Sequence, residues 1–230
     1  MRIISNTKKI ERNHKIGLYT SLASLLFLII AVGMTFRVEL TLYSFGAMLL
    51  GLVLSQIGVY FANRWGKSPR IDERITQGLK GLDDRYTLYH YTSPVPHLVT
   101  GPSGVWVLTA QYHPGRISYE NKGYRQQGVG MFSRLVGQEG LSRPELEAQA
   151  YQQDMVKFLK KQMPEESLPP VHTLIVFTSD KASVQAQDAP IPTMHIEKLK
   201  DFLRRMTKEK PADANAVRKV EDLLPEEDII

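Results

Sequence analysis

Two long apolar runs follow each other near the start of the chain, and they constrain its fold more than any other feature. Ile16–Phe36 contains no charged residue, and Leu40–Ala62 has Gln56 as its one strongly polar side chain. A helix of about 20 residues crosses the roughly 30 Å hydrocarbon core of a bilayer, so each run is long enough to span it. Only residues 37–39 separate the runs. The pattern predicts a transmembrane helical hairpin with the lipid bilayer as its partner.

A cleaved signal peptide and a buried pair of soluble helices are the competing interpretations. A signal peptide has a shorter apolar core and a small-residue cleavage site, whereas a second apolar run follows at once here. Lys and Arg residues flank both outer ends of the hairpin, and in the turn Arg37 is offset by Glu39. The positive-inside rule then predicts a cell-membrane protein with two spans and both termini in the cytoplasm.

The excess positive charge belongs to the amino-terminal segment. Residues 1–63 contain six Lys/Arg and two Asp/Glu, which leaves 23 of the 29 basic and 22 of the 24 acidic residues for 64–230. A net charge of +1 on the larger part argues against a strongly basic surface for nucleic acid. The chain has no cysteine, which excludes disulfides and thiolate metal ligands.

Four segments are expected along the chain. They are a basic cytoplasmic tail over 1–15, the hairpin over 16–63 with helices 16–36 and 40–62, an α/β domain over 64–208, and a carboxy-terminal helix and tail over 209–230. Periodicity and turn signals predict helices and short strands in alternation within the α/β domain. The expected helices are 71–82, 142–163 and 197–206, and the expected strands are 86–91, 97–100, 104–110, 116–119, 171–178 and 193–195. This order predicts a mixed central sheet flanked by helices.

The stretch HLVTGPSGVWVLTAQYHPGRI, residues 97–117, resembles the core of the nuclease-related domain (NERD) family. That family is a branch of the restriction-endonuclease-like fold. Its pattern is an Asp-His pair before a strand, Gly-Pro-x-Gly, a second strand ending Glu-x-Lys, and Gly-x-Ile. The matching residues here are His97, Gly101, Pro102, Gly104, Gly115 and Ile117, and the resemblance extends over roughly 68–206. The resemblance implies a restriction-endonuclease-like domain behind the hairpin.

The catalytic positions of that family are altered in this chain. Such nucleases use two carboxylates and a lysine around Mg²⁺, a hard ion that prefers anionic oxygen ligands. The aspartate position falls on Pro96, and the Glu-x-Lys positions fall on Thr109 and Gln111. The family's Asn-Pro-x-x-Gln helix start corresponds to residues 143–147 and ends at Glu147, while Glu73 matches the glutamate of the opening helix. The resemblance therefore implies a degenerate nuclease site with no metal and no cofactor, and Mg²⁺ enters only if the site is displaced.

Two further sites stay open on the sequence. Glu73, Glu147, His97 and His113 could surround one cleft and hold a transition metal; the simpler interpretation places His97 in the core and Glu147 in solvent. Aromatic and basic residues also interleave beyond the second matched strand, as in surfaces that hold single-stranded nucleic acid. The residues concerned are Tyr112, Arg116, Lys122, Tyr124 and Arg125, and an ordinary exposed hairpin is the alternative interpretation.

The sequence favours a non-catalytic, membrane-anchored binding or scaffold module over an enzyme. Nucleic acid or another protein at the cytoplasmic face of the membrane is the expected partner. A Mg²⁺-dependent DNA or RNA nuclease with a displaced active site is the main alternative. A membrane-organising module for protein–protein interaction is the third.

Overall fold

The structure is a computed structural model that describes residues 1–66, 68–128, 141 and 143–230. It separates into two compact units. One is an α/β unit formed by Met1–Thr7 together with Ile71–Ile230, and the other is a helical unit, Lys8–Arg70. The helical unit is therefore inserted into the chain of the α/β unit, rather than preceding it.

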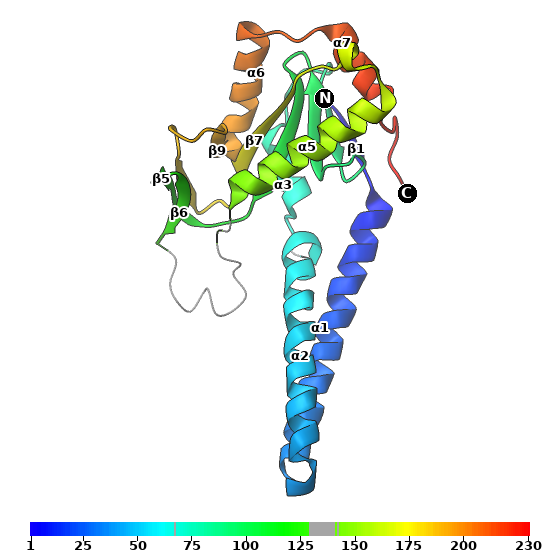
Figure 1. Cartoon of the computed structure of the whole chain (residues 1–230), viewed down its shortest axis with the longest axis vertical. Helices are drawn as coiled ribbons and strands as arrows, with labels where there is room; N and C mark the ends of the chain where they lie inside the picture. Colours follow the sequence, from blue (N-terminus) through cyan, green and yellow to red (C-terminus); the bar gives the residue numbers. More distant parts are fainter. Residues whose placement is uncertain (67, 129–140, 142) are drawn as a thin grey trace. The chain divides into compact units, whose positions relative to one another are not determined.

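The helical unit is a hairpin of two long helices (Figure 1). Helix α1 runs over Thr7–Thr35 and helix α2 over Thr41–Phe61, with the short 3₁₀ helix η1, Val38–Leu40, between them and a π-helical turn, η2, at Ala62–Gly66. Two helical stretches, Thr7–Thr35 and a second that begins at Val38, are long and apolar enough to cross a membrane. The two helices that the sequence predicts are thus present, although α1 begins nine residues before the predicted start at residue 16.

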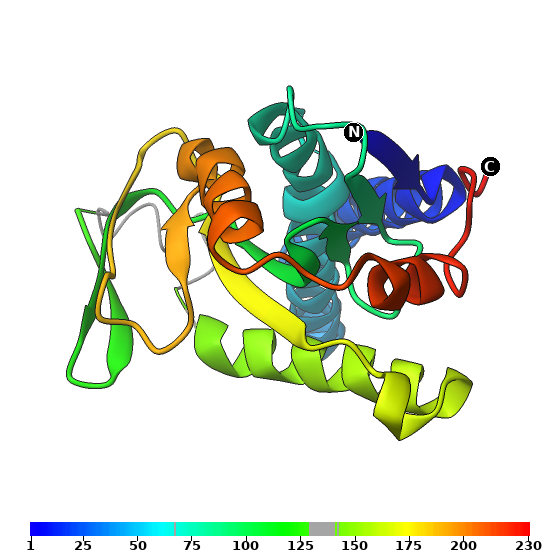
Figure 2. The same cartoon turned by 90° about the horizontal axis from the view of Figure 1, so that it is seen from above.

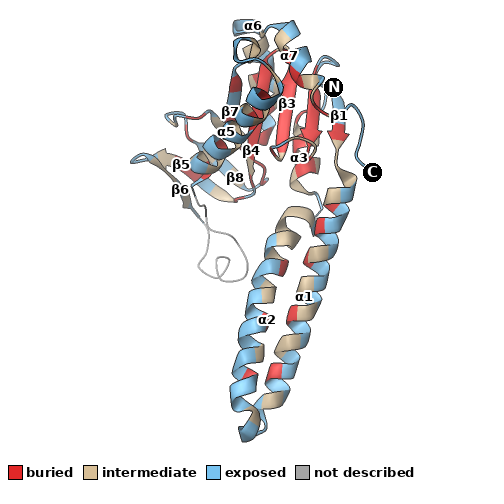
Figure 3. Cartoon of the chain, turned by 45° about the vertical axis from the view of Figure 1, so that its right-hand side comes forward, coloured by how far each residue is buried: buried red, intermediate tan, exposed pale blue. Residues whose placement is uncertain are grey.

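Small residues form the interface between α1 and α2, and most large apolar residues of both helices are exposed. Figure 3 shows the few buried positions of the two helices among exposed and intermediate ones. The Oγ of Ser24 donates to the carbonyl of Gly51 at 2.8 Å, and the Oγ of Ser44 donates to the carbonyl of Ala31 at 2.8 Å. Along the apolar stretches the buried positions recur every seven residues; they are Gly17, Ser24 and Ala31 on α1, and Ser44, Gly51 and Gly58 on α2. Close approach at small residues is typical of helix pairs in lipid.

A mixed six-stranded sheet forms the centre of the α/β unit. Its strand order is β1-β2-β3-β4-β7-β9, in which β2, β3 and β4 are antiparallel neighbours and the pairs β1–β2, β4–β7 and β7–β9 are parallel. The strands are Arg2–Ser5, Thr87–His90, His97–Gly101, Gly104–Gln111, Val171–Phe177 and Thr193–His195 in that order. A second sheet of order β6-β5-β8 contains Gly123–Gln127, Gly115–Glu120 and Ala182–Gln185.

Helices cover both faces of the six-stranded sheet (Figure 2). Alternate residues of β4 point to opposite faces: Trp106 and Leu108 join the core beneath α3 and α6, whereas Val105 and Val107 join the core beneath α5 and α7. The four helices are α3, Ile71–Gly78; α5, Pro144–Gln162; α6, Leu199–Glu209; and α7, Ala214–Glu221, and the short 3₁₀ helices η3, Glu165–Ser167, and η4, Ile196–Lys198, precede β7 and α6. The mixed α/β architecture with flanking helices agrees with the prediction.

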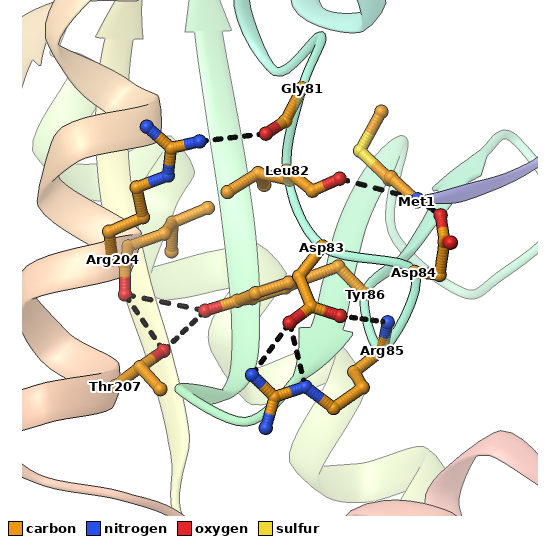
Figure 4. A network of polar contacts seen from close by, with 10 residues as sticks. Met1, Gly81, Leu82, Asp83, Asp84, Arg85, Tyr86, Arg204 and Thr207 are labelled. Atoms are coloured by element: carbon orange, nitrogen blue, oxygen red, sulfur yellow. Dashed lines mark hydrogen bonds and ion pairs between the residues drawn. The ribbon is translucent and has the colours of Figure 1, made fainter.

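The loop between α3 and β2 is held from two sides (Figure 4). The amino group of Met1 donates to Asp84 Oδ1 at 2.7 Å, and Arg204 of α6 donates to the carbonyl of Gly81 at 2.7 Å. The Tyr86 hydroxyl bonds with Thr207 on the same helix. These contacts fasten both the start of β1 and helix α6 to one loop.

The structure differs from the predicted segments at both ends of the chain. Residues 1–15 are not a tail, because Arg2–Ser5 form β1 and α1 begins at Thr7. Residues 209–230 belong to the same unit as the sheet, since Val217 and Val220 of α7 are buried and Val220 contacts the core beneath α5. Strands β6 and β8 were not expected from the sequence, and the predicted helix start at Ser142 lies outside the described residues.

Candidate ligand site at the carboxyl ends of the strands

One edge of the six-stranded sheet gathers the polar residues of interest. The parallel register pairs Gln111 of β4 with Phe177 of β7, and Phe177 with His195 of β9, so these three strands end together. At the same edge His90, which ends β2, pairs with His97, which begins β3. Ligands of open α/β sheets bind in the crevice outside the carboxyl ends of the strands. A ligand site is therefore expected at this edge of the sheet.

At the end of β4, Gln111, one of the two positions that the resemblance matches to Glu-x-Lys, belongs to a hydrogen-bonded network. Gln111 is 6% exposed, and its Nε2 donates to Glu147 Oε2 at 2.6 Å. The Tyr151 hydroxyl donates to Glu147 Oε1 at 2.8 Å. Thr109 is fully buried on the same face of the strand. Both carboxylate oxygens of Glu147 are thus engaged by neutral donors, so Glu147 is not the solvated residue of the simpler interpretation.

At the start of β3 the aspartate position holds Pro96, whose side chain offers no ligand atom. Its carbonyl accepts a hydrogen bond from the amide of Tyr91 at 2.8 Å, which closes the β2–β3 loop. Tyr91 has a φ of 59°, a left-handed conformation that is uncommon outside glycine. Pro96 therefore serves the turn rather than the site.

Two buried histidines lie directly beneath α3. The Nδ1 atoms of His90 and His97 are 2.9 Å apart, and His90 Nε2 lies 3.0 Å from Thr76 Oγ1. Burial, and then the neighbouring His90, hold the pKa of His97 well below its usual value. His97 is therefore accommodated as a neutral imidazole, and one Nδ1–H of the pair donates to the other Nδ1. The simpler interpretation of His97 as a core residue is confirmed, since it is 3% exposed.

The substitute metal site considered on the sequence finds no support in the described ranges. Among these residues no group of three or more His, Cys, Asp or Glu side chains lies close enough to hold a metal ion. Glu147 bonds with Gln111 and Tyr151 on the α5 side of the sheet, whereas the His97 pair contacts α3 on the other side. The sheet itself separates two of the four proposed ligands.

The aromatic and basic residues proposed for nucleic acid do not share one face. Tyr124 packs with the core of the small sheet and its hydroxyl lies 2.5 Å from Thr193 Oγ1; burial raises the pKa of Tyr124. Arg116 and Arg125 lie on the other face, because each is one residue from the inward-facing pairs of the β5–β6 ladder. Lys122 occupies the β5–β6 turn with a φ of 61°. Tyr124 is therefore a packing residue and not an exposed stacking platform.

Tyr112 follows the end of β4 and belongs to a different cluster. It is 47% exposed, and the guanidinium of Arg74 lies 5.2 Å from its ring centroid. Arg74, on α3, also donates to the carbonyl of Thr178 at 3.1 Å and to Asp180 Oδ1 at 2.8 Å. The arginine is thereby held against the residues that follow β7.

An open pocket of about 330 Å³ adjoins this cluster. Its walls come from α3, from the residues after β7, and from the β9–η4–α6 segment; the lining residues are Arg74, Gln77, Gly78, Thr178, Asp180, His195, Ile196, Glu197 and Lys200. The close packing of α3 on η4 requires Gly78, because a Cβ there would lie 2.5 Å from Ile196 Cγ1. His195 Nε2 donates to the carbonyl of Ser179 at 3.0 Å. The pocket can bind a small polar ligand.

The sequence analysis singled out none of these pocket residues. Arg74 lies on a helix that the sequence predicts; Thr178 ends the predicted strand 171–178, and Ser179-Asp180 directly follows it. Polar residues just after the carboxyl end of such a strand are a usable signal. This signal does not show which other residues line the pocket, because only the tertiary fold brings α3 and η4 to the end of β7.

No family model, no curated protein and no solved structure matches this chain. The functional argument therefore rests on the residues and the geometry described above.

Proposed function

We propose that the chain is a membrane-anchored binding module whose α/β unit has a restriction-endonuclease-like fold without a nuclease metal site. Its expected place is the cytoplasmic face of the cell membrane. The module is expected to bind a ligand or partner without cleaving phosphodiesters.

The order and pairing of the elements support the fold proposal. Helix α3 precedes three antiparallel strands, β2, β3 and β4, and helix α5 then leads to β7, which is parallel to β4. This arrangement is consistent with the restriction-endonuclease-like plan implied by the matched residues around His97–Ile117. The additional strands β1 and β9 extend the sheet on its two sides.

The hydrogen bonding of Glu147 is the observation that supports the non-catalytic proposal. Its two carboxylate oxygens accept hydrogen bonds from Gln111 and Tyr151 at 2.6 and 2.8 Å. Phosphoryl-transfer catalysis by such nucleases depends on charge placed around the phosphate and its metal ion. At the end of β4 an amide, a phenol and the buried Thr109 occupy that region. The carboxylate is used for packing α5 onto the sheet instead.

Two observations support the membrane proposal: most apolar residues of the hairpin are exposed, and strand β1 precedes the hairpin in the chain. Only 17% and 11% of the apolar windows of the two candidate spans are buried, whereas the core helices of a soluble protein are mostly buried. A signal peptide would be removed together with β1, whose Ile4 is 1% exposed in the core of the α/β unit. The large apolar side chains of α1 and α2 therefore require lipid or an equivalent apolar surrounding.

An activity assay on the full chain in detergent tests the non-catalytic proposal. The protein is incubated with plasmid, single-stranded DNA and RNA in millimolar Mg²⁺ or Mn²⁺, beside Glu73→Ala and Glu147→Gln. We expect no metal-dependent cleavage by any of the three proteins. Cleavage that is lost in either variant would instead establish the alternative, a nuclease with a displaced site. Cleavage that persists equally in both variants points to a contaminating nuclease and is resolved by repurification to constant specific activity.

A further inference from the structure

We propose that the pocket lined by Arg74, Asp180 and Lys200 binds a small zwitterion that carries an ammonium and an oxyacid group on neighbouring carbons. A free α-amino acid is the simplest ligand of this class. The inference rests on the proposed function of the α/β unit as a binding module, and it names the ligand chemistry of that module.

The charges of the pocket are balanced and come from different elements. Arg74 of α3 and Lys200 of α6 supply two positive charges, and Asp180 after β7 and Glu197 of η4 supply two negative charges. A simple anion would meet the two carboxylates, and a simple cation would meet the guanidinium and the ammonium. A ligand that carries both charges complements both sets at once.

Arg74 is positioned before any ligand arrives. Its side chain is 12% exposed in its ion pair with Asp180, it donates to the Thr178 carbonyl, and it lies over the ring of Tyr112. A planar guanidinium held in this way is suited to an oxyacid group, since little side-chain freedom is lost on binding. Lys200 adds a second cation, with one of its three protons directed to the carbonyl of Lys80 at 3.3 Å.

The two carboxylates are suited to the ammonium group. Asp180, which pairs with Arg74, is 81% exposed, and Glu197, whose Oε2 lies 3.3 Å from His195 Nδ1, is 84% exposed. An ionised carboxylate offers about four lone-pair directions, so each of these side chains can accept further hydrogen bonds. Neither carboxylate has to break a buried hydrogen-bond network in order to contact a ligand.

The dimensions of the pocket favour a small ligand. Small-molecule sites commonly occupy about 300–1,000 Å³ and are mostly apolar. This pocket, at about 330 Å³, lies at the lower end of that range, and its walls are mostly polar. Ile196 in the pocket wall is the apolar surface next to which a short apolar side chain can lie.

The test is calorimetric titration of the full chain in detergent with the free L-amino acids and, in a second arm, with O-phosphoethanolamine. The amino acids and O-phosphoethanolamine both carry an ammonium and an acid group. Binding in the first arm indicates a free metabolite as the ligand, and binding in the second arm indicates a lipid headgroup. For any ligand that binds, the N-acetyl derivative removes the ammonium; the methyl ester removes the acid group of an amino acid, and ethanolamine lacks the phosphate of O-phosphoethanolamine. We expect each derivative to bind at least about tenfold more weakly, because each loses charge-assisted hydrogen bonds.

Variants of the exposed residues make the test independent of folding. Lys200→Gln and Asp180→Asn are each expected to weaken binding about tenfold or more, while Lys208→Gln and Asp188→Asn, exposed and outside the pocket lining, leave it unchanged. Equal thermal unfolding of all four proteins verifies their folding. The proposal is overturned if no zwitterion binds, if the derivatives bind as well as the parent, or if the pocket variants bind normally. Nuclease activity, which would overturn the proposed function, is measured separately and has no bearing on this result.

Discussion

Ile3 of β1 lies opposite Leu88 of β2 in a parallel pair, although the whole helical unit separates the two residues in the chain. Residues on both sides of the hairpin therefore complete one sheet. Residues near the carboxy terminus also contact β1, since the amide of Ile229 donates to the carbonyl of Ser5 at 3.0 Å. The α/β unit thus depends on chain segments that precede the hairpin.

This dependence predicts unequal effects of two neighbouring substitutions in β1. Ile4 is 1% exposed and contacts the core beneath α5, whereas Ile3 is 42% exposed. Ile4→Ala is expected to lower the free energy of unfolding of the α/β unit by about 2–4 kcal/mol, because it removes buried methyl groups and leaves a cavity. Ile3→Ala is the matched control, with an expected change below about 1 kcal/mol. Denaturant unfolding of the full chain in detergent measures both, and equal losses would contradict the pairing of β1.

The same pairing predicts the topology of the chain in a membrane. Since β1 and β2 share a sheet, the two ends of the hairpin must lie on the same side of the bilayer. Lys and Arg at both outer ends indicate that this side is the cytoplasm. Reporter fusions at residue 38 and at residue 230 are expected to give external and cytoplasmic signals, respectively. An external signal from residue 230, or matching signals from both sites, would refute the two-span topology.

The sequence predicts the elements of this fold much better than it predicts their partners. The length of the uncharged runs predicts the hairpin, and mostly apolar runs predict β4 and β7, because burial on both faces leaves few polar positions. Strand β1, with the sequence Arg-Ile-Ile-Ser, is too short for its period to stand out, and its partner lies beyond the hairpin. A basic tail was therefore predicted where the structure has an edge strand.

The candidate site shows the same division between local and tertiary information. The sequence alone carries the resemblance that assigns Pro96, Thr109 and Gln111 to acidic and basic catalytic positions. The bond between Gln111 and Glu147 is not visible in the sequence, because 36 residues separate them and only the packing of α5 brings them together. The inward orientation of Tyr124 depends likewise on its contact with Thr193 of β9.

The hairpin interface predicts that glycine positions in α2 differ in their tolerance of a side chain. A Cβ at Gly58 would lie 2.4 Å from Ser21 Oγ and 3.1 Å from the backbone nitrogen of Ser21, whereas a Cβ at Gly46 would have no atom within 4 Å. Gly58→Ile is expected to separate α1 from α2 and to destabilise the hairpin by about 1–3 kcal/mol. Gly46→Ile is the control and should leave the hairpin intact. Resistance to proteolysis and to SDS in detergent-purified protein measures the difference, and identical behaviour would contradict the interface.

The histidine pair predicts a loss of stability in mild acid. The pKa of His97 is well below its usual value because the ring is buried and lies beside His90. The unfolded chain therefore binds a proton near pH 6.5 that the folded chain does not, so stability falls as the pH drops below that value. The slope is at most about 1.4 kcal/mol per pH unit for one proton. Denaturant unfolding between pH 8 and pH 5 should show a shallower acid limb for His97→Gln than for the wild type. A His97→Gln profile parallel to that of the wild type would count against a neutral, buried His97.

A final prediction separates a structural role of Glu147 from a catalytic one. Removing its carboxylate takes away the acceptor of the Gln111 amide, a side chain that is 6% exposed, and one hydrogen bond of the half-buried Tyr151 hydroxyl. A buried donor left without a partner costs about 1–3 kcal/mol, so Glu147→Ala is expected to lower unfolding free energy by about that amount. Glu147→Gln retains one acceptor oxygen and should lose less, and Glu166→Ala, at an exposed position of η3, should lose little. If Glu147 were instead a metal ligand held against charge repulsion, Glu147→Gln would stabilise the metal-free protein and abolish any stabilisation by added Mg²⁺ or Mn²⁺. Thermal unfolding of the four proteins with and without metal distinguishes the two roles, because the network predicts a ranking of stability that metal does not change.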